Sequence, residues 1–139
     1  MARWAISSGS KSEALAGYSR AVVDGEWVFV SATAGYDLNN NNTIPDDAEE
    51  QTRQSLSIIS AALAQAGATL SDVVRVRVYL ADRNDVVAVS RILASTFSDP
   101  RPANTTIICG FPAPEVKVEL EVTALKRPAS AIRHSIPET

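Results

Sequence analysis

The sequence predicts an α+β fold in which a mixed sheet carries two helices on one of its faces. Residues 21–30 hold two β-branched and aromatic runs joined by Asp24-Gly25, which is typical of a tight hairpin. Residues 73–80 and 116–125 alternate between apolar and polar side chains, as strands with one buried face do. Two segments between these strands carry apolar residues at three- and four-residue spacing, which predicts amphipathic helices. Packing both helices on one face of the sheet is the simplest arrangement that buries all of these stripes.

The size and composition predict a single globular domain over residues 1–139. Hydrophobic residues make up 45% and charged residues 21% of the chain, an ordinary balance for a folded domain. The net charge of -3 leaves no basic excess to neutralise a phosphate backbone, so we expect no nucleic-acid partner. We find neither a signal-peptide-like start nor a long apolar run, and therefore expect a cytoplasmic protein without membrane contact.

Cysteine and histidine are too scarce for a metal site. Cys109 cannot form an internal disulfide, and together with His134 it cannot build a zinc cluster. Nothing near Cys109 in the sequence would lower its pKa, so we expect a small, inert, buried side chain.

The N-terminal region is expected to contain a short edge strand at residues 3–7 and then a loop at residues 7–13. Residues 38–46 are polar and lack hydrophobic periodicity, which predicts a solvated loop. The first long helix then begins, with Asp46 as its N-cap and Glu49 at the capping-box spacing, and it ends before Gly67. Its buried stripe is predicted to be Thr52, Leu56, Ile59, Leu63 and Ala66.

The second half of the chain is expected to add a strand, a helix and two further strands. The strand at residues 73–80 is predicted to bury Val74, Val76, Val78 and Leu80. The helix is capped by Asn84 or Asp85 and ends at a proline-rich segment. Its apolar face is predicted to be Val86, Val89, Leu93 and Phe97. A short strand at residues 105–108 and a flexible tail at residues 127–139 complete the order β-β-β-α-β-α-β-β.

The face of the sheet away from the helices is expected to carry charges of both signs. Its polar side chains are Arg75, Arg77, Tyr79, Lys117, Glu119 and Glu121. Their alternation predicts cross-strand pairs, and the purely structural interpretation of Glu119 is a pair with Arg75 or Arg77. Because a single helical layer covers only one face, we expect other subunits to cover this one, with a solvated face as the alternative.

Three segments of the chain resemble the RidA (YjgF) family. They are GYSRAVVDGEWVFVSATAGYD at residues 17–37, AEEQTRQSLSIISAALAQAGATLSDVVRVRVYLADRNDVVAV at residues 48–89, and RPANTTIICGFPAPEVKVELEVTAL at residues 101–125. The resemblance implies a chorismate-mutase-like fold and a homotrimer with three clefts between neighbouring subunits. In the best-known branch of the family these clefts hydrolyse 2-imino and 2-aminoacrylate intermediates to 2-keto acids and ammonium. That reaction uses no metal or organic cofactor, so none is expected.

The same resemblance implies which residues line the cleft. Glu119 corresponds to a residue near the reacting water and is the expected catalytic group. The expected ligand-binding positions are Tyr18, Ser31, Ala32, Ser90, Asn104 and Thr106. Ala32 replaces a glycine, Ser90 a frequent asparagine and Thr106 the cysteine of some relatives. Asn104 replaces the arginine of a Pro-Ala-Arg tripeptide.

The residue at position 104 changes the chemistry that the cleft offers. An arginine holds a ligand carboxylate through a charge-assisted bidentate contact worth about 1.5–3 kcal/mol. Asn104 offers one neutral hydrogen bond instead, so we expect an altered ligand unless another arginine replaces the lost cation. The candidates for such a replacement are Arg20, Arg75, Arg77 and Arg101.

Three functions are consistent with the sequence. The first is a RidA-like homotrimer that binds a small metabolite, such as a keto or imino acid, and acts as a hydrolytic deaminase of altered specificity. The second is a non-catalytic ligand-binding or chaperone-like trimer. The third, an endoribonuclease, is disfavoured by the acidic net charge and by a single histidine in the tail. Residues 36–46 are a possible lid, in which Tyr36 either enters the cleft or packs in a turn.

Overall fold

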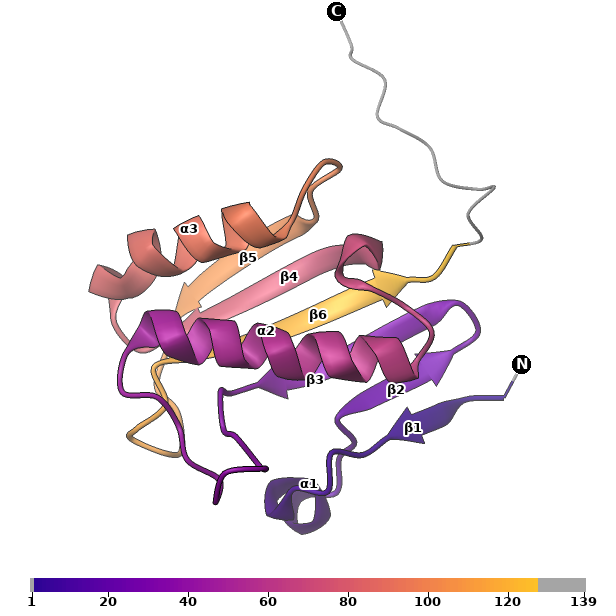
Figure 1. The fold of residues 1–139 in the computed structure, drawn as a ribbon, viewed down its shortest axis with the longest axis horizontal. Coiled ribbons are helices and arrows are strands. Elements are labelled where there is room, and N and C mark those ends of the chain that lie inside the picture. The colour runs from indigo at the N-terminus through magenta and orange to yellow at the C-terminus, as the bar shows by residue number, and fades with distance from the viewer. Residues whose placement is uncertain (1, 128–139) are drawn as a thin grey trace, which may run out of the picture.

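The computed structural model describes residues 2–127, and its centre is one mixed six-stranded sheet (Figure 1). The strands are β1 (Trp4–Ile6), β2 (Ala21–Asp24), β3 (Trp27–Thr33), β4 (Val73–Leu80), β5 (Ala103–Ile108) and β6 (Val118–Leu125). Their order across the sheet is β1-β2-β3-β6-β4-β5. Only β4 and β5 run parallel, and the other neighbours are antiparallel. The predicted α+β class with a mixed sheet is confirmed.

Two long helices, α2 (Ala48–Gln65) and α3 (Val86–Thr96), lie on the same face of the sheet (Figure 1). Short 3-10 turns at Leu70–Asp72 and Arg83–Asp85 lead into β4 and α3. The opposite face of the sheet is covered by no element of residues 2–127. The predicted one-sided arrangement of the helices is therefore confirmed.

A third helix, α1 (Lys11–Ala16), occupies most of the segment predicted to be a loop at residues 7–13. Ser10 is its N-cap and accepts a hydrogen bond from the Glu13 amide at 3.2 Å. Gly17 ends it in the left-handed conformation, with φ at 73°. The loop prediction was wrong because this Ser-x-x-Glu spacing and the following glycine define a one-and-a-half-turn helix without any apolar stripe.

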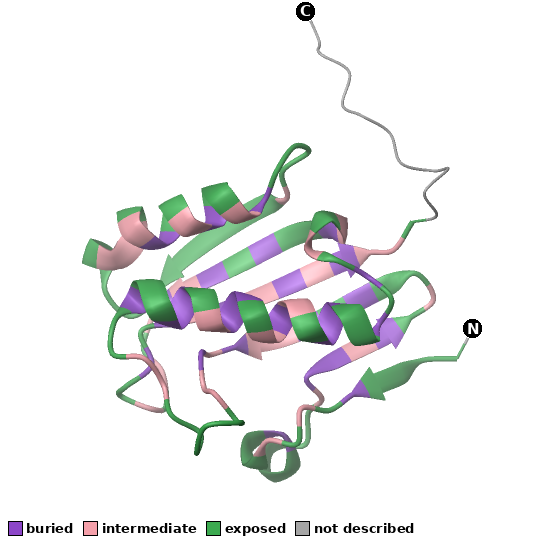
Figure 2. Cartoon of the chain, in the orientation of Figure 1, coloured by how far each residue is buried: buried purple, intermediate pink, exposed green. Residues whose placement is uncertain are grey.

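The hydrophobic core lies between the helices and the sheet (Figure 2). The predicted stripe of α2 is buried in full, and β6 buries every second residue from Val118 to Ala124. On α3, Val89, Leu93 and the C-cap residue Phe97 are buried, and Val86 packs partly against the core. The period of 3.6 in the helices and of 2 in the strand therefore identified the core correctly.

The structure differs from the prediction at three positions: the N-cap of α2, the burial of Val74 and the first residue of β5. The N-cap of α2 is Asp47 rather than Asp46, and its carboxylate accepts from the Glu50 amide at 2.7 Å. Val74 is 37% exposed rather than buried, because the pairing of β4 with β6 shifts at this position and Val73 takes the inward place. The strand predicted to begin at residue 105 begins at Ala103.

Other predicted boundaries are confirmed. Gly67 follows α2 with φ at 82°, and the Ala68 amide donates to the Leu63 carbonyl at 2.8 Å, which closes the helix end. Asp85 is the N-cap of α3, although its side chain makes no capping hydrogen bond. The asparagine-rich loop is exposed at residues 38–43. Most of the predicted flexible tail, from residue 128 onward, lies outside the described residues.

A buried glutamine on α2 holds two loops together beside the start of β6. The Gln51 amide nitrogen donates to the carbonyls of Pro45 at 2.8 Å and Glu115 at 3.0 Å, and its oxygen accepts from the Lys117 amide at 2.8 Å. Gly35 lies so close that an added Cβ would stand 2.7 Å from the Gln51 carbonyl oxygen. The segments before α2 and before β6 are thus fixed to one another through the helix.

We expect Gln51→Leu to lower the free energy of unfolding by about 3 kcal/mol, because three partly buried backbone groups lose their partners and the buried position loses its hydrogen bonds. Urea denaturation monitored by circular dichroism measures the loss. Gln65→Leu, at an exposed position of the same helix, is the matched control and should change stability by less than about 0.5 kcal/mol. Equal stabilities of the two variants would show that Gln51 does not hold the loops.

Within residues 2–127, no helix is long and apolar enough to cross a membrane.

Candidate functional site

The predicted site residues fall into two groups in the folded chain. Tyr18, Ser31, Ala32 and Glu119 belong to the first group, which surrounds the end of β3 and the start of β6. Ser90, Asn104 and Thr106 form the second group, on α3 and on the edge strand β5.

A β-bulge shapes the first group. The pairing of β3 with β6 shifts between Val30 and Thr33, so the carbonyls of Ser31 and Ala32 leave the regular ladder. Arg20 forms hydrogen bonds with this irregular segment. Its Nη1 donates to the Ala32 carbonyl at 3.1 Å and to the Thr33 hydroxyl at 2.7 Å. The Ser31 hydroxyl donates to the Ser19 carbonyl at 2.7 Å. The hydroxyl of this predicted ligand-binding residue is therefore already engaged in holding the loop.

Arg20 is buried and forms an ion pair with Glu13 of α1. Its Nη2 lies 3.8 Å from Glu13 Oε2, and its guanidinium stands 5.6 Å from the centre of the Tyr18 ring. Burial alone would raise the pKa of Glu13, but hydrogen bonds from Ser8 and Ser10 and the charge of Arg20 lower it to about 2. The pair therefore stays ionised and fixes α1 and Tyr18 against the bulge.

The lowered pKa of Glu13 predicts acid sensitivity. A carboxyl whose folded pKa lies below its ordinary value of 4.5 stabilises the fold at higher pH, and this contribution is lost as the pH falls toward 2. We expect Glu13→Gln to cost about 2–3 kcal/mol at pH 7 and progressively less between pH 4.5 and pH 2. Denaturant titrations of both proteins at several pH values measure the difference. A cost that does not change with pH would contradict this assignment.

Glu119 is half-buried on the sheet face away from the helices, opposite Tyr79 in the pairing of β6 with β4. Burial raises its pKa, and the positive charge of Arg20 acts in the opposite sense. The predicted structural pair of Glu119 with Arg75 or Arg77 is not found. Within residues 2–127, Glu119 makes neither a hydrogen bond nor an ion pair, so its carboxyl group is available for chemistry.

The structural pairing role belongs to Glu121 instead. Arg77 Nη1 lies 3.4 Å from Glu121 Oε2, and the Tyr79 hydroxyl donates to Glu121 Oε1 at 2.7 Å. This hydrogen bond is the main cause of the raised pKa of Tyr79. The expected cross-strand pairs are therefore present, but on the second glutamate of β6.

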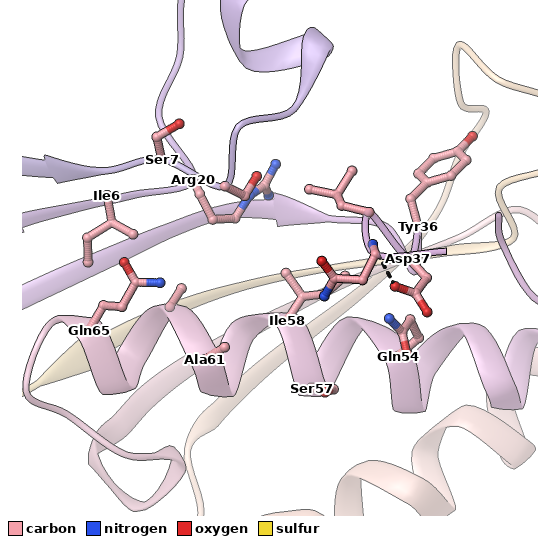
Figure 3. Close-up of a pocket in the computed structure, with 14 residues that line it drawn as sticks. Ile6, Ser7, Arg20, Tyr36, Asp37, Gln54, Ser57, Ile58, Ala61 and Gln65 are labelled. Carbon is pink, nitrogen blue, oxygen red and sulfur yellow. Dashed lines mark hydrogen bonds between the residues drawn. The ribbon is translucent and has the colours of Figure 1, made fainter. Parts of the chain in front are cut away.

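Sequence patterns did not predict the hydrogen bond between Tyr36 and Glu115, nor that the charge of Glu119 acts on Tyr36. The Tyr36 hydroxyl donates to Glu115 Oε2 at 2.6 Å, and the Tyr36 ring points away from α2 (Figure 3). Burial first, then this hydrogen bond and the charges of Glu115 and Glu119, raise the pKa of Tyr36 to about 12. The bond also lowers the pKa of the Glu115 carboxyl. Glu115 follows a proline-rich turn, and no sequence pattern marks it as a partner of Tyr36.

The second group lies along the exposed edge of the sheet. Asn104 and Thr106 pair with Val76 and Val78 of β4, so their side chains lie on the helix side of β5. The Thr106 hydroxyl donates to the Asn104 side-chain oxygen at 2.9 Å. Both residues are exposed, as is Ser90 on α3.

One chain does not bring the two groups together. Glu119 pairs with Tyr79, which pairs with Ile107 of β5, and Asn104 lies three residues farther along that strand. With strands about 4.8 Å apart and about 3.3 Å per residue, the Cα atoms of Glu119 and Asn104 are ~14 Å apart. Their side chains also leave opposite faces of the sheet. A small ligand therefore cannot touch both within one chain.

The arginines expected as replacement cations are mostly engaged. Arg20 is buried in the bulge, Arg77 pairs with Glu121, and Arg101 donates to the Ala94 carbonyl at 3.5 Å. Arg75 is exposed and has no partner among residues 2–127. It lies level with Ala103 on the face opposite to the Asn104 side chain.

A shallow groove of about 340 Å³ lies between α2, the N-terminal segment and the loop after β3 (Figure 3). Arg20 and Tyr36 reach this groove, but none of the predicted site residues lines it. Its walls are mostly uncharged, with Gln54, Ser57 and Gln65 from α2. The groove is therefore distinct from the predicted cleft. No cluster of His, Cys, Asp and Glu side chains in residues 2–127 is arranged to hold a metal ion.

Comparisons with known proteins place this fold and these residues in one family. The sequence matches the family described as Endoribonuclease L-PSP over residues 9–126. A RutC family protein of Pyrococcus abyssi is 31% identical over 126 residues, which cover 91% of this chain and 99% of that protein. A crystal structure of a YjgF/YER057c/UK114 family member from Mycobacterium tuberculosis is 40% identical with a TM-score of 0.82, covering 90% of this chain and 100% of that one. A RidA from an Antarctic Psychrobacter is 26% identical with a TM-score of 0.75, covering 88% and 94%. The chain therefore belongs to the RidA/YjgF family, as the three segments of its sequence indicate.

Proposed function

We propose that the protein is a homotrimer that binds a small carbonyl or imine compound in clefts between neighbouring copies and hydrolyses an enamine or imine there. The observation that carries the proposal is the division of the site. Glu119 and the Tyr18 loop lie at one place on the chain, and Asn104, Thr106 and Ser90 lie at another. A second copy placed with its β5 edge against the Glu119 region would complete the site.

The uncovered surfaces of the chain support such an assembly. Trp27 and Phe29 stand on the open sheet face, 44% and 47% exposed, with their rings stacked 6.2 Å apart. All six residues of β5 are exposed, including Ile107 and Ile108. An exposed aromatic pair and an unpaired strand edge with exposed aliphatic residues are each typical of surfaces that associate. Self-association would bury both.

Hydrolysis of an imine requires one group that moves protons. Water adds to the imine carbon and gives one proton to Glu119, which passes it to the imine nitrogen, so a carbinolamine forms. The hydroxyl proton of the carbinolamine then moves through Glu119 to the same nitrogen as the C–N bond breaks, which releases ammonia and leaves the carbonyl. A carboxyl whose pKa is raised by burial can accept a proton and return it to the leaving nitrogen. Glu119 is suited to this because no other side chain of residues 2–127 engages it.

The test is a trapping assay. Enamine and imine intermediates are generated in situ by an amino-acid oxidase or a dehydratase and are captured by semicarbazide. We expect the purified protein to lower the captured fraction in proportion to its concentration. A relative that carries the arginine serves as the positive control. No effect from this protein beside a working control would overturn the catalytic proposal.

A ligand-binding trimer without turnover is the second candidate. The loss of the arginine at Asn104 favours it, since a cleft can keep its shape and bind a ligand after losing its catalytic substrate. This candidate predicts that small ligands raise the melting temperature while the trapping assay shows no acceleration. Both candidates, the hydrolase and the ligand-binding trimer, are proposed to be cytoplasmic. In both, the chain is a single domain and has no nucleic-acid partner.

A further inference from the structure

We propose that Lys117 is the anion-binding residue of the cleft and that Tyr36 keeps its ammonium group free by engaging Glu115. The cleft then selects carbonyl or imine compounds that carry an acid group next to the reacting carbon. This inference rests on the proposed function, because it assigns a binding residue and a ligand class to that same cleft. Two observations carry it: the place of Lys117 beside Glu119, and the hydrogen bond between Tyr36 and Glu115.

Lys117 lies immediately before β6, two residues from Glu119 and on the same face of the sheet. Its backbone is fixed on both sides. The amide donates to Gln51 Oε1 at 2.8 Å, and the carbonyl accepts from the Ala81 amide at 3.0 Å. The side chain is exposed, and its ammonium group makes neither a hydrogen bond nor an ion pair within residues 2–127. The fold therefore places a free cation at a set spacing from the proposed proton acceptor.

The spacing of these two side chains suits a small acid. Residues two apart along a strand lie about 6.6 Å from one another and point the same way. In the proposed reaction Glu119 reaches the reacting carbon through one water molecule. The Lys117 ammonium reaches the neighbouring acid group through a direct charge-assisted hydrogen bond, which is about 2.8 Å long. A keto or imino acid in which one C–C bond joins the two groups spans this gap.

Glu115 is the carboxylate that competes for Lys117, because it is exposed and lies two residues before it. In the structure Glu115 Oε2 instead accepts the hydrogen bond from the Tyr36 hydroxyl at 2.6 Å, which also lowers the pKa of the Glu115 carboxyl. Gln51 holds the main chain at this contact, since its amide nitrogen donates to the Glu115 carbonyl at 3.0 Å. Tyr36 is therefore a positioning residue that engages the competing carboxylate and leaves the ammonium group to the ligand.

The arginines on this side of the chain are less suited to bind the acid group. Arg20 and Arg77 already pair with glutamates of the chain. Arg75 is exposed and has no partner in the described part of the chain, but it lies four residues along β4 from Tyr79, which pairs with Glu119. At about 3.3 Å per residue this places its Cα ~13 Å along the strand from the level of Glu119, about twice the spacing of Lys117.

The experiment compares two probes with the same carbon skeleton, pyruvate and its neutral amide, pyruvamide, by NMR titration of the full-length protein. Lys117→Met keeps the apolar stem and removes the charge. We expect it to weaken pyruvate binding at least about tenfold and pyruvamide binding by less than about threefold. Lys117→Arg should keep the preference for pyruvate. Lys126→Met, just beyond the opposite end of β6, is the matched control and should leave both affinities unchanged.

Tyr36→Phe tests the positioning role. Loss of the hydroxyl releases Glu115, which can then pair with Lys117, so pyruvate binding should weaken at least about threefold. Adding Glu115→Gln to Tyr36→Phe removes the competing charge and should restore the affinity of the unaltered protein. A loss that Glu115→Gln does not rescue would overturn the role given to Tyr36.

Pyruvate binding that survives Lys117→Met overturns the proposal, and its loss in Arg75→Met would assign the anion to that arginine instead. Failure of the proposed function gives a different pattern. If pyruvate binds through Lys117 but the trapping assay shows no turnover, the hydrolytic function is overturned and the anion site stands. If neither probe binds the unaltered protein, the anion site is overturned as well.

Discussion

Replacing Arg20 by methionine should lower the free energy of unfolding by about 3–5 kcal/mol, the usual cost of leaving a buried charge without its partner. Methionine keeps the apolar stem but removes the guanidinium, so the Glu13 carboxylate loses its ion-pair partner and the carbonyls of Ser31 and Ala32 lose a donor. Guanidinium chloride denaturation at pH 7 measures the loss. Arg53→Met, which breaks an exposed i,i+3 pair with Glu50, is the control and should cost less than about 1 kcal/mol.

The double variant Glu13→Met with Arg20→Met separates the ion pair from general packing. Removing both charges leaves no uncompensated ion in the interior, so we expect part of the lost stability to return. A double variant as unstable as the sum of the single ones would show that the two residues act independently. That result would contradict the role given to the pair in holding α1 against the bulge.

Replacing Glu119 by glutamine should lower turnover in the trapping assay by at least about 100-fold, because the amide cannot accept the proton of the attacking water. The shape and polarity of the site are kept, so ligand affinity should change by less than about threefold. Glu121→Gln is the matched control: it lies on the same strand and face but is bound to Arg77 and Tyr79. Turnover in that variant should stay within about threefold of the unaltered protein.

The pH profile gives a second readout of Glu119. Its raised pKa means that the carboxylate form, which accepts the proton, appears at a higher pH than for an ordinary glutamate. Activity should therefore rise with pH through a value above 4.5, and the residual activity of Glu119→Gln should lack this rise. An unchanged profile in the variant would assign the titration to another group.

The main elements of the fold were predictable because regular secondary structure repeats with a fixed period. Leu56, Ile59 and Leu63 on α2 recur at helical spacing, and β6 alternates without interruption. The errors in predicted burial fall where irregular strand pairing interrupts the regular period. Val74 is turned outward by the irregular pairing at the start of β4, and a bulge depends on the partner strand rather than on the residue itself.

The candidate site was only half predictable for a related reason. Glu119 and Asn104 were identified from a resemblance along the sequence, which says nothing about whether they meet. Arg20 was expected as a candidate free cation. Its guanidinium instead donates hydrogen bonds to the bulge, which lies eleven to thirteen residues farther along the chain. The Tyr36–Glu115 hydrogen bond joins residues 79 positions apart, and no local pattern encodes it.

The mass of the protein in solution tests the central claim most directly, because the proposed site exists only between copies. Sedimentation equilibrium at the concentration of the activity assay should give about 44 kDa, three times the chain mass of 14.8 kDa. The same experiment on a variant with Trp27 and Phe29 both replaced by serine shows whether the open sheet face holds the copies together, and we expect a smaller species. A single chain of 14.8 kDa that hydrolyses the imine at full rate would contradict a site shared between subunits.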